Sequence, residues 1–187
     1  MRLLKHGSIE LVLGNIVHQD TDAIVNAANT KLAGGGGVDG AIHRAAGPEL
    51  KQLCLHFPAD ENGRRCPTGQ VKITAAGNLA AKYVIHAVGP FYNEKYAEKA
   101  HSQLRLLHET ALQVAVEHQC KSIAFPAIST GAYRFPVADA ANIAIDAICS
   151  FLNSSPGIEL VRFILYKAAA LHYDIFRSSL EKWKVPL

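Results

Sequence analysis

The chain has 187 residues, of which 49% are hydrophobic and 19% are charged. This length and composition predict one globular domain over residues 1–187 and exclude an intrinsically disordered chain. The formal net charge of +3 is too small to argue for a nucleic-acid-binding surface.

Alternating and β-branched runs predict strands, and apolar residues at helical spacing predict helices. In chain order they give strands at 9–13 and 22–26, a helix at 38–46, a helix that begins at Pro48, strands at 71–74 and 83–88, a helix at 97–118, a strand at 122–125, a helix at 136–152, a strand at 160–166 and a helix at 172–183. Strands that alternate with helices favour an α/β sandwich around a largely parallel sheet.

A run of four glycines, 34–37, precedes the helix at 38–46. Without Cβ atoms the backbone can approach a ligand closely, and its N–H groups and the positive end of the helix favour phosphate. The alternative is a flexible surface turn. Segment 35–40 also matches G-x-G-x-x-G, but nine residues separate Val25 from Gly35, and no lysine completes a Walker A loop.

Asp39 lies in the first turn of the helix after the glycines, and His43 lies four residues on, on the same helix face. One interpretation of Asp39 is structural, because a carboxylate stabilises a helix N-terminus. The other is a base beside a bound phosphate, acting through a bridging water because two negative groups repel each other. His43 alone is more often a packing or surface histidine than a catalyst.

The second loop, 126–136, offers backbone N–H groups around Gly131, two hydroxyl groups, the ring of Tyr133 and the guanidinium of Arg134. Such a set can hold a diphosphate and place a ring against a sugar. Ligands of open α/β sheets gather at the carboxyl ends of strands. We therefore expect this loop and the glycine run to face one crevice.

Segment 127–131 also resembles a degraded G-x-S-x-G nucleophile elbow, and Ser129, Asp146 and His172 follow the chain order of one hydrolase triad. The elbow requires a helix directly after the serine, whereas the helical pattern here begins only at Pro136. A serine hydrolase is therefore disfavoured on sequence grounds.

The four cysteines form no C-x-x-C pair, and no group of His, Cys, Asp and Glu has the spacing of metal ligands. They are Cys54, Cys66, Cys120 and Cys149. We expect reduced thiols in a cytoplasmic protein that requires neither a metal nor another cofactor. No apolar run is long enough for a membrane span or a signal peptide, so no membrane partner is expected.

Four motifs together resemble a macrodomain of the MacroD type, over about residues 8–183. They are Val25-Asn26-Ala27-Ala28-Asn29, the segment 34–43 with its glycines and Asp39, Cys66-Pro67-Thr68-Gly69, and Ala127-Ile128-Ser129-Thr130-Gly131. The resemblance implies a three-layer α/β/α sandwich with a mixed sheet of about six strands. It also implies a crevice for ADP-ribose, and metal-independent hydrolysis of O-acetyl-ADP-ribose and of ADP-ribose joined to acidic side chains.

The resemblance implies a catalytic set of Asn29, Asp39 and His43. Asn29 would hydrogen-bond the distal ribose, Asp39 would orient or activate the attacking water with help from a substrate phosphate, and His43 would support that region. Binding residues are implied on three segments. They are Gly35, Gly36, Gly37 and Val38 for a phosphate and the distal ribose; Ser129, Thr130, Gly131 and Ala132 for the diphosphate, with Tyr133 on the distal ribose; and Asn15, Ile16 and Tyr166 for adenine and its ribose.

Three positions depart from the pattern of the family. Asn15 replaces the aspartate that accepts from the adenine amino group, and an amide oxygen accepts without charge. Lys167 follows Tyr166 where an acidic residue is common, and Arg134 stands where glycine is frequent. Neither Asn29 nor Asp39 is affected by these departures.

The resemblance also implies the partners. They are ADP-ribose, ADP-ribosylated proteins or O-acetyl-ADP-ribose, with nucleic-acid adducts of ADP-ribose as a further class, and we expect a monomer. The same two loops would serve a non-catalytic module that only reads ADP-ribose, which is the alternative function. The aspartate favours the hydrolase, because a reader does not need it.

Overall fold

The computed structural model describes residues 1–166 and 170–184. The strands are β1 (Arg2–Leu3), β2 (Ser8–Leu13), β3 (Ala23–Ala27), β4 (Val71–Ala75), β5 (Tyr83–Ala87), β6 (Ser122–Phe125) and β7 (Leu160–Leu165). The helices are α1 (Gly37–Ala46), α2 (Pro48–Leu55), α3 (Ala97–Glu117), α4 (Val137–Ser154) and α5 (Ala170–Lys182), with short 3₁₀ helices η1 (Ile16–His18) and η2 (Glu94–Tyr96). Every strand and helix predicted from sequence is present, with ends displaced by two residues or fewer.

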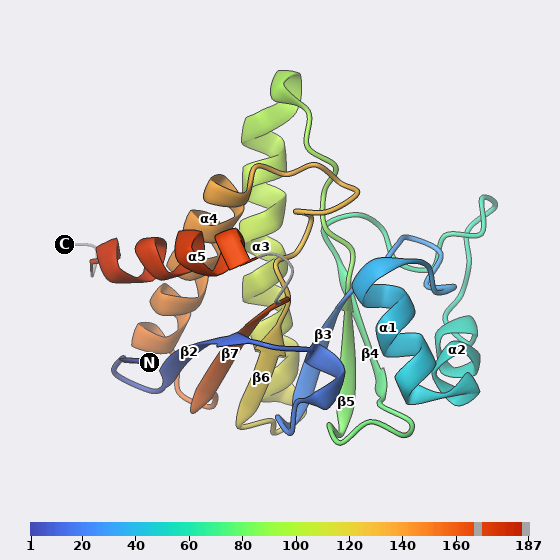
Figure 1. Cartoon of the computed structure of the whole chain (residues 1–187). Helices are drawn as coiled ribbons and strands as arrows, with labels where there is room; N and C mark the ends of the chain where they lie inside the picture. Colours follow the sequence, from blue (N-terminus) through green and yellow to red (C-terminus); the bar gives the residue numbers. More distant parts are fainter. Residues whose placement is uncertain (167–169, 185–187) are drawn as a thin grey trace.

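The strands form one mixed sheet in the order β1-β2-β7-β6-β3-β5-β4 (Figure 1). The pairs from β2 to β5 are parallel, whereas β1 and β4 are antiparallel edge strands. The sheet has seven strands, one more than the expected number of about six, and the additional strand is β1. Two residues are too short a segment to show any alternation, and β1 exists because it pairs with β2.

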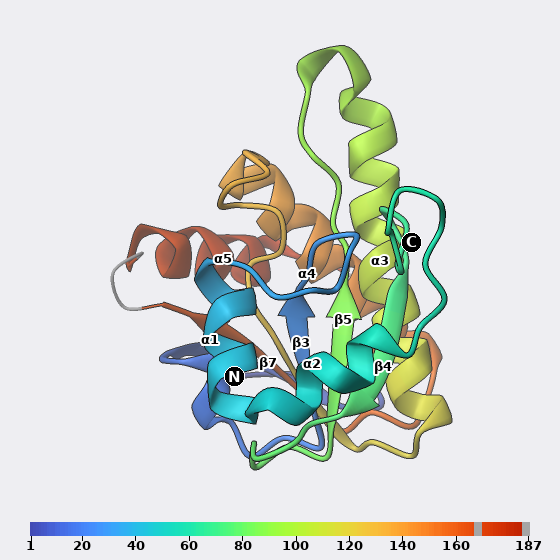
Figure 2. The same ribbon diagram turned by 90° about the vertical axis from the view of Figure 1, so that its right-hand side faces the viewer.

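Helices cover both faces of the sheet, which confirms the three-layer α/β/α sandwich. In Figure 2, α1 and α2 lie in front of β3 and β5, and α3 lies behind them. Ile24 and Val84 pack with Ile42 of α1 and Leu50 of α2. The next residue of each strand, Val25 or Ile85, belongs instead to the core formed with α3, α4 and α5. Strands buried on both faces are typical of parallel sheets.

The strand pairing places the two predicted loops side by side. Ala23 and Ile24 of β3 pair with Ile123 and Ala124 of β6 in parallel, so the carboxyl ends of both strands lie at one edge of the sheet. The glycine run leads from β3 to α1, and the second loop leads from β6 to α4, which begins one residue after Pro136. Among the helices of residues 1–166 and 170–184, none combines the length and apolarity that a membrane span requires.

Candidate functional site

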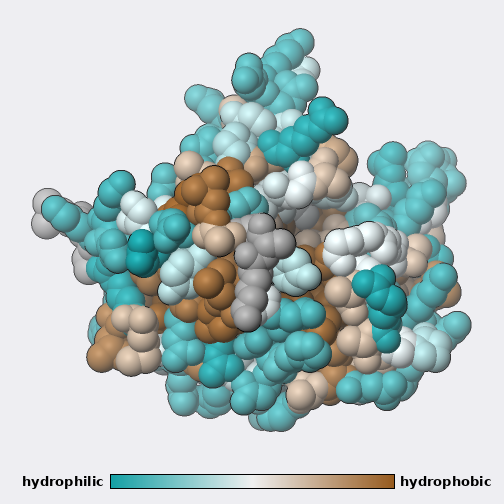
Figure 3. Space-filling view, in the orientation of Figure 1, coloured by the Kyte–Doolittle hydropathy of each residue, from teal (hydrophilic) through white to brown (hydrophobic). Residues whose placement is uncertain are grey.

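A cavity of about 550 Å³ opens between the two loops. Its volume lies in the usual range for small-molecule sites. Of the residues predicted from sequence, those that line it are Asn29, 35–38, Asp39, 129–133 and Tyr166. Apolar surface gathers near the middle of the face seen in Figure 1, within a largely hydrophilic surround (Figure 3). The expectation that both loops face one crevice is confirmed.

The predicted adenine residues lie differently. Tyr166 lines the cavity and is 65% exposed, whereas Asn15 and Ile16 are outside its lining. The side-chain oxygen of Asn15 accepts a hydrogen bond from Val17 N at 3.2 Å and caps η1. The assignment of Asn15 and Ile16 to adenine therefore stays a prediction. Lys167 lies outside the described residues.

The first loop presents backbone to the cavity. Gly34 and Gly37 have φ of +83° and +56°, a region that favours glycine. A Cβ on Gly36 or Gly37 would meet no other atom within 4 Å, so the backbone here is open to a ligand. The N-cap Gly36 has no side chain to bond the free N–H groups of the first turn of α1. Such a helix N-terminus is suited to an anion.

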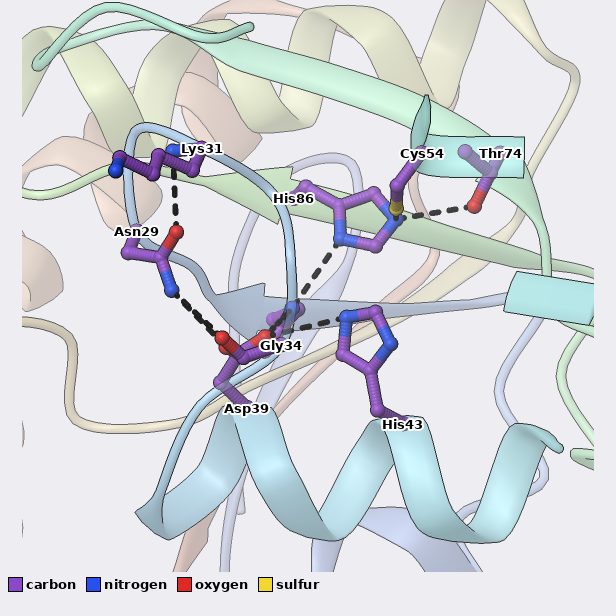
Figure 4. Close-up of polar contacts among 9 residues, drawn as sticks. Asn29, Lys31, Gly34, Asp39, His43, Cys54, Thr74 and His86 are labelled. Carbon is purple, nitrogen blue, oxygen red and sulfur yellow. Dashed lines mark hydrogen bonds and ion pairs between the residues drawn. The ribbon is translucent and has the colours of Figure 1, made fainter. Parts of the chain in front are cut away.

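Asp39 lies beside these N–H groups and is only 5% exposed (Figure 4). Asn26 Nδ2 donates to its Oδ1 at 2.6 Å, and His43 Nε2 is 3.5 Å from the same oxygen. Asn29 Nδ2 is 3.5 Å from its Oδ2. Burial raises the pKa of Asp39, while the hydrogen bond from Asn26 and the charge of His43 oppose that rise. The carboxylate is therefore more basic than an exposed aspartate.

Asn29 holds the first loop in place. Its Nδ2 donates to the Gly34 carbonyl at 3.0 Å, and its Oδ1 accepts from Lys31 N at 3.0 Å. Gly35 is close to both polar groups, because a Cβ there would lie 3.1 Å from Asp39 Oδ2 and 3.5 Å from Asn29 Nδ2. His43 lies outside the lining of the cavity, and its Nε2 contacts Asp39 Oδ1 at 3.5 Å. The catalytic role of His43 stays a prediction.

The second loop is held by bonds within itself. Thr130 Oγ1 donates to the Ala127 carbonyl at 2.8 Å, and Phe135 N donates to the Ser129 carbonyl at 3.0 Å. Ser129 and Arg134 have φ of +66° and +58°. The left-handed backbone at Arg134 is a conformation that favours glycine, which accounts for the glycine frequent at this position of the family pattern.

An aromatic pair closes one end of the second loop. Tyr133 stacks on Phe91, with ring centroids 3.9 Å apart, and its carbonyl accepts from Tyr92 N at 2.9 Å. Phe91 is 64% exposed, so the stacked pair lies at the protein surface. These contacts fix the ring of Tyr133 in the wall of the cavity, where it can pack against a sugar.

The serine-hydrolase interpretation does not survive the geometry. Asp146 Oδ1 accepts from Trp183 Nε1 at 2.8 Å, and its Oδ2 pairs with Arg105. Within the described residues, the contacts of this carboxylate are therefore with Trp183 and Arg105 and not with a histidine. His172 and Ser129 both line the cavity, but Ser129 Oγ has no hydrogen-bond partner in the described part of the chain. A nucleophilic serine needs a base within hydrogen-bond reach and a group that orients the base.

His43, Cys54 and His86 each offer one possible metal-ligand atom, and these atoms lie within 4.8 Å of one another. Protein hydrogen bonds occupy this cluster, however. His86 Nε2 lies 3.0 Å from Thr74 Oγ1 and 3.5 Å from Cys54 Sγ. Burial raises the pKa of the Cys54 thiol to about 11. A protonated thiol beside a hydrogen-bonded ring indicates a polar cluster of the core rather than a preformed metal site.

The sequence assigns no role to Asn26, which bonds Asp39, or to His86, which contacts Asn26. In the sequence, Asn26 is only a member of a motif and His86 only part of a predicted strand. Both are fully buried inside strands that are otherwise apolar. A polar residue within a strand buried on both faces is the signal that could have identified them, because such a group requires a partner.

The comparisons with known proteins agree on one family. A family model described as Macro domain matches residues 25–144. A macro domain-containing protein of Caldanaerobacter subterraneus subsp. tengcongensis is 47% identical over 93% of this chain and 96% of its own length. A protein of Citrobacter rodentium named O-acetyl-ADP-ribose deacetylase is 47% identical over 84% of this chain and 88% of its own. The solved Oceanobacillus iheyensis macrodomain with ADP has a TM-score of 0.90 and 39% identity, covering 96% of this chain and 93% of that one.

Proposed function

The chain belongs to the macrodomain family, and on that premise we propose that it binds ADP-ribose between the two loops and hydrolyses esters of ADP-ribose. The observation that carries the proposal is the position of Asp39. Its buried carboxylate lies in the wall of the cavity, beside the free N–H groups at the start of α1. One site therefore combines an anion-binding backbone with a basic group.

The two loops support the binding part of the proposal. ADP-ribose is a diphosphate between two sugars, so it needs N–H donors at its centre and flat or polar surfaces at both ends. The segments 35–38 and 129–132 both line the cavity and are proposed to supply the backbone donors. Tyr133 is proposed to contact the distal ribose and Tyr166 the adenosine end.

Asp39 supports the chemical part. We assign Asp39 the activation of the attacking water. Its Oδ2 accepts a proton from the water as the water oxygen bonds to the ester carbonyl carbon. The bond from that carbon to the ribose oxygen then breaks, and the proton passes to the ribose oxygen. The products are a free carboxylic acid and an ADP-ribose hydroxyl. A phosphate of the substrate helps to hold the water, and the raised pKa of Asp39 makes it a better base near neutral pH.

The ester class is supported by the relatives. Proteins of Citrobacter rodentium and Enterobacter cloacae subsp. cloacae that are 47% and 45% identical to this chain are named O-acetyl-ADP-ribose deacetylase. An acyl group of an acidic side chain presents the same ester to Asp39, so mono-ADP-ribosylated proteins are included in the proposal. The reaction is proposed to need no metal and to occur in a monomer. The four free, buried cysteines fit a reducing compartment such as the cytoplasm.

A product assay tests the proposal. The protein is incubated in EDTA with O-acetyl-ADP-ribose and, separately, with a protein that carries mono-ADP-ribose on glutamate, and free ADP-ribose is followed by mass spectrometry. Release from either ester supports hydrolysis without a metal. Calorimetric binding of ADP-ribose with no release from either ester would instead assign a reader.

A further inference from the structure

A series of buried polar side chains runs from Asp39 into the sheet (Figure 4). Asn26 Nδ2 lies 2.6 Å from Asp39 Oδ1 and 3.2 Å from His86 Nδ1, and His86 Nε2 lies 3.0 Å from Thr74 Oγ1. Asn26 and His86 are register partners in the parallel strands β3 and β5. Strand pairing therefore sets the position of each group in the series.

The hydrogen bonds of Asn26 determine the tautomer of His86. The amide nitrogen carries two protons, of which one goes to Asp39 Oδ1 and the other to His86 Nδ1. Nδ1 must therefore be the unprotonated acceptor of the ring. Burial lowers the pKa of His86 to about 3, so the ring is neutral near pH 7 and its one proton is on Nε2. Thr74 Oγ1, 3.0 Å from Nε2, is placed to accept that proton, and Cys54 Sγ lies 3.5 Å from the same nitrogen.

The reversed orientation of the Asn26 amide is unfavourable. It would place Oδ1, an acceptor, 2.6 Å from a carboxylate oxygen of Asp39 in a buried site. In the favoured orientation Asn26 Oδ1 has no partner within residues 1–166 and 170–184. The fold thus satisfies the two donor positions of this amide and leaves its oxygen unpaired. A buried amide oxygen without a partner is rare, which indicates that the two N–H donors of Asn26 are the groups needed at this position.

We propose that His86 is a positioning residue for the ester hydrolysis: through Asn26 it holds the carboxylate of Asp39 so that Oδ2 faces the cavity. The inference rests on the proposed function of Asp39. Oδ1 is held from the sheet side, whereas Oδ2 is the oxygen near Asn29 and Gly35, two residues of the cavity wall. A displacement of about 1 Å in such a group can cost about 100-fold in rate.

The other titratable groups that face Asp39 are His43 on α1, Cys54 on α2 and Tyr133 on the second loop. Burial raises the pKa of Tyr133 and raises that of the Cys54 thiol to about 11, so both are neutral near pH 7. His43 Nε2 is 3.5 Å from Oδ1, so a change of this side chain would alter the contacts of the same carboxylate oxygen. His43 is therefore left unchanged in the variants that test the proposal.

Two substitutions separate positioning from packing. H86L fills the buried position with an apolar side chain and removes the acceptor, whereas H86N supplies an oxygen near the place of Nδ1. We expect H86L to lower kcat about 10-fold to 100-fold with ADP-ribose affinity changed less than about threefold, and H86N to recover most of the rate. Equal loss in both variants, or loss of ADP-ribose binding together with rate, contradicts positioning.

Two readouts need no turnover, so they separate this inference from the proposed function. Nitrogen-15 spectra of the wild-type ring are expected to show a protonated Nε2 and an unprotonated Nδ1, and the opposite tautomer overturns the inference. The carboxyl carbon of Asp39 is titrated by NMR in the wild type and in H86L. We expect a higher pKa in H86L, because the donor that lowers the pKa of Asp39 is no longer held. An unchanged pKa also overturns the inference, whether or not the protein hydrolyses any ester.

Discussion

The carboxylate of Asp39 is surrounded by amide donors and one histidine rather than by a permanent cation. Burial therefore has the largest effect on its pKa, which is raised. Asn29 adds to this arrangement from the cavity side, since its Nδ2 lies 3.0 Å from the Gly34 carbonyl and 3.5 Å from Asp39 Oδ2. The orientation of the Asp39 carboxylate therefore depends on where each amide N–H donor points.

Replacing the donor of Asn29 by an acceptor should affect the pH profile. In N29D a second carboxylate would face Asp39 Oδ2 and the Gly34 carbonyl. We expect the pKa of Asp39 to rise further, so that the acid limb of kcat/KM moves to higher pH and the rate near neutral pH falls at least about 10-fold. The measurement is kcat/KM between pH 5 and 9. In N29A, which adds no charge, the limb should stay near its wild-type position; a shift as large as that of N29D would contradict the electrostatic account.

Asn29 and Asp39 are predictable from the sequence because they flank one glycine run, and local spacing brings them together. Asn26 and His86 are 60 residues apart, and only the pairing of β3 with β5 brings them into contact. The contact of His86 with Thr74 likewise requires a third strand, β4. Sequence patterns indicate periodicity and turn chemistry, so they do not predict which residues of distant strands are in contact.

At the scale of elements, the first turn of α1 and the loop before it are in backbone contact. A Cβ on Gly40 would overlap the carbonyl oxygen of Gly35. This close approach keeps the loop folded over the start of the helix, where its N–H groups face the cavity. The sequence shows the glycine at position 40 but gives no reason for it, because the requirement comes from a neighbouring segment of backbone.

G40A is therefore expected to displace the first loop. Overpacking of this kind costs about 1–3 kcal/mol in unfolding free energy, and the displaced N–H groups should also weaken ADP-ribose binding. Urea denaturation and calorimetry measure the two effects. G36A is the matched control for stability, because a Cβ there meets nothing within 4 Å. Equal stability of G40A and the wild type would show that the contact is not required.

The strands and helices differ in how well the sequence predicts them. Buried strands and long amphipathic helices have strong periodic patterns, so all of them are found with small errors at their ends. β1 has no pattern of its own; pairing with β2 and the contact of Arg2 with the ring of Trp183, 5.0 Å from its centroid, hold it in place. Elements that exist only through tertiary contacts leave no local signal.

At the scale of the whole molecule, buried histidines link stability to pH. His108 on α3 is 1% exposed, packs against Phe125 with ring centroids 5.4 Å apart, and hydrogen-bonds the Leu104 carbonyl through Nδ1 at 2.8 Å. Burial lowers its pKa from 6.5 to about 4. Below pH 6.5 the unfolded chain therefore binds a proton that the folded protein does not, and the folded state loses stability as the pH falls.

H108F should flatten this part of the stability profile. In the wild type we expect a loss of order 3 kcal/mol from this residue between pH 6.5 and about 4. The phenyl ring keeps the contact with Phe125 and has no proton to bind. Unfolding free energies from urea melts at pH 4 to 7 test this, and a slope as steep in H108F as in the wild type would assign the acid sensitivity to other groups. Ester turnover should be unaffected at pH 7.

The central claim is that the two loops bind the ligand while Asp39 performs the hydrolysis. D39N tests it most directly, because it keeps the shape of the side chain and removes the base. ADP-ribose affinity is measured by calorimetry, and release of ADP-ribose from the ester is measured at saturating substrate. The account predicts that D39N loses about 100-fold to 10,000-fold in kcat while it binds ADP-ribose about as tightly as the wild type. Turnover by D39N at the wild-type rate would contradict the claim.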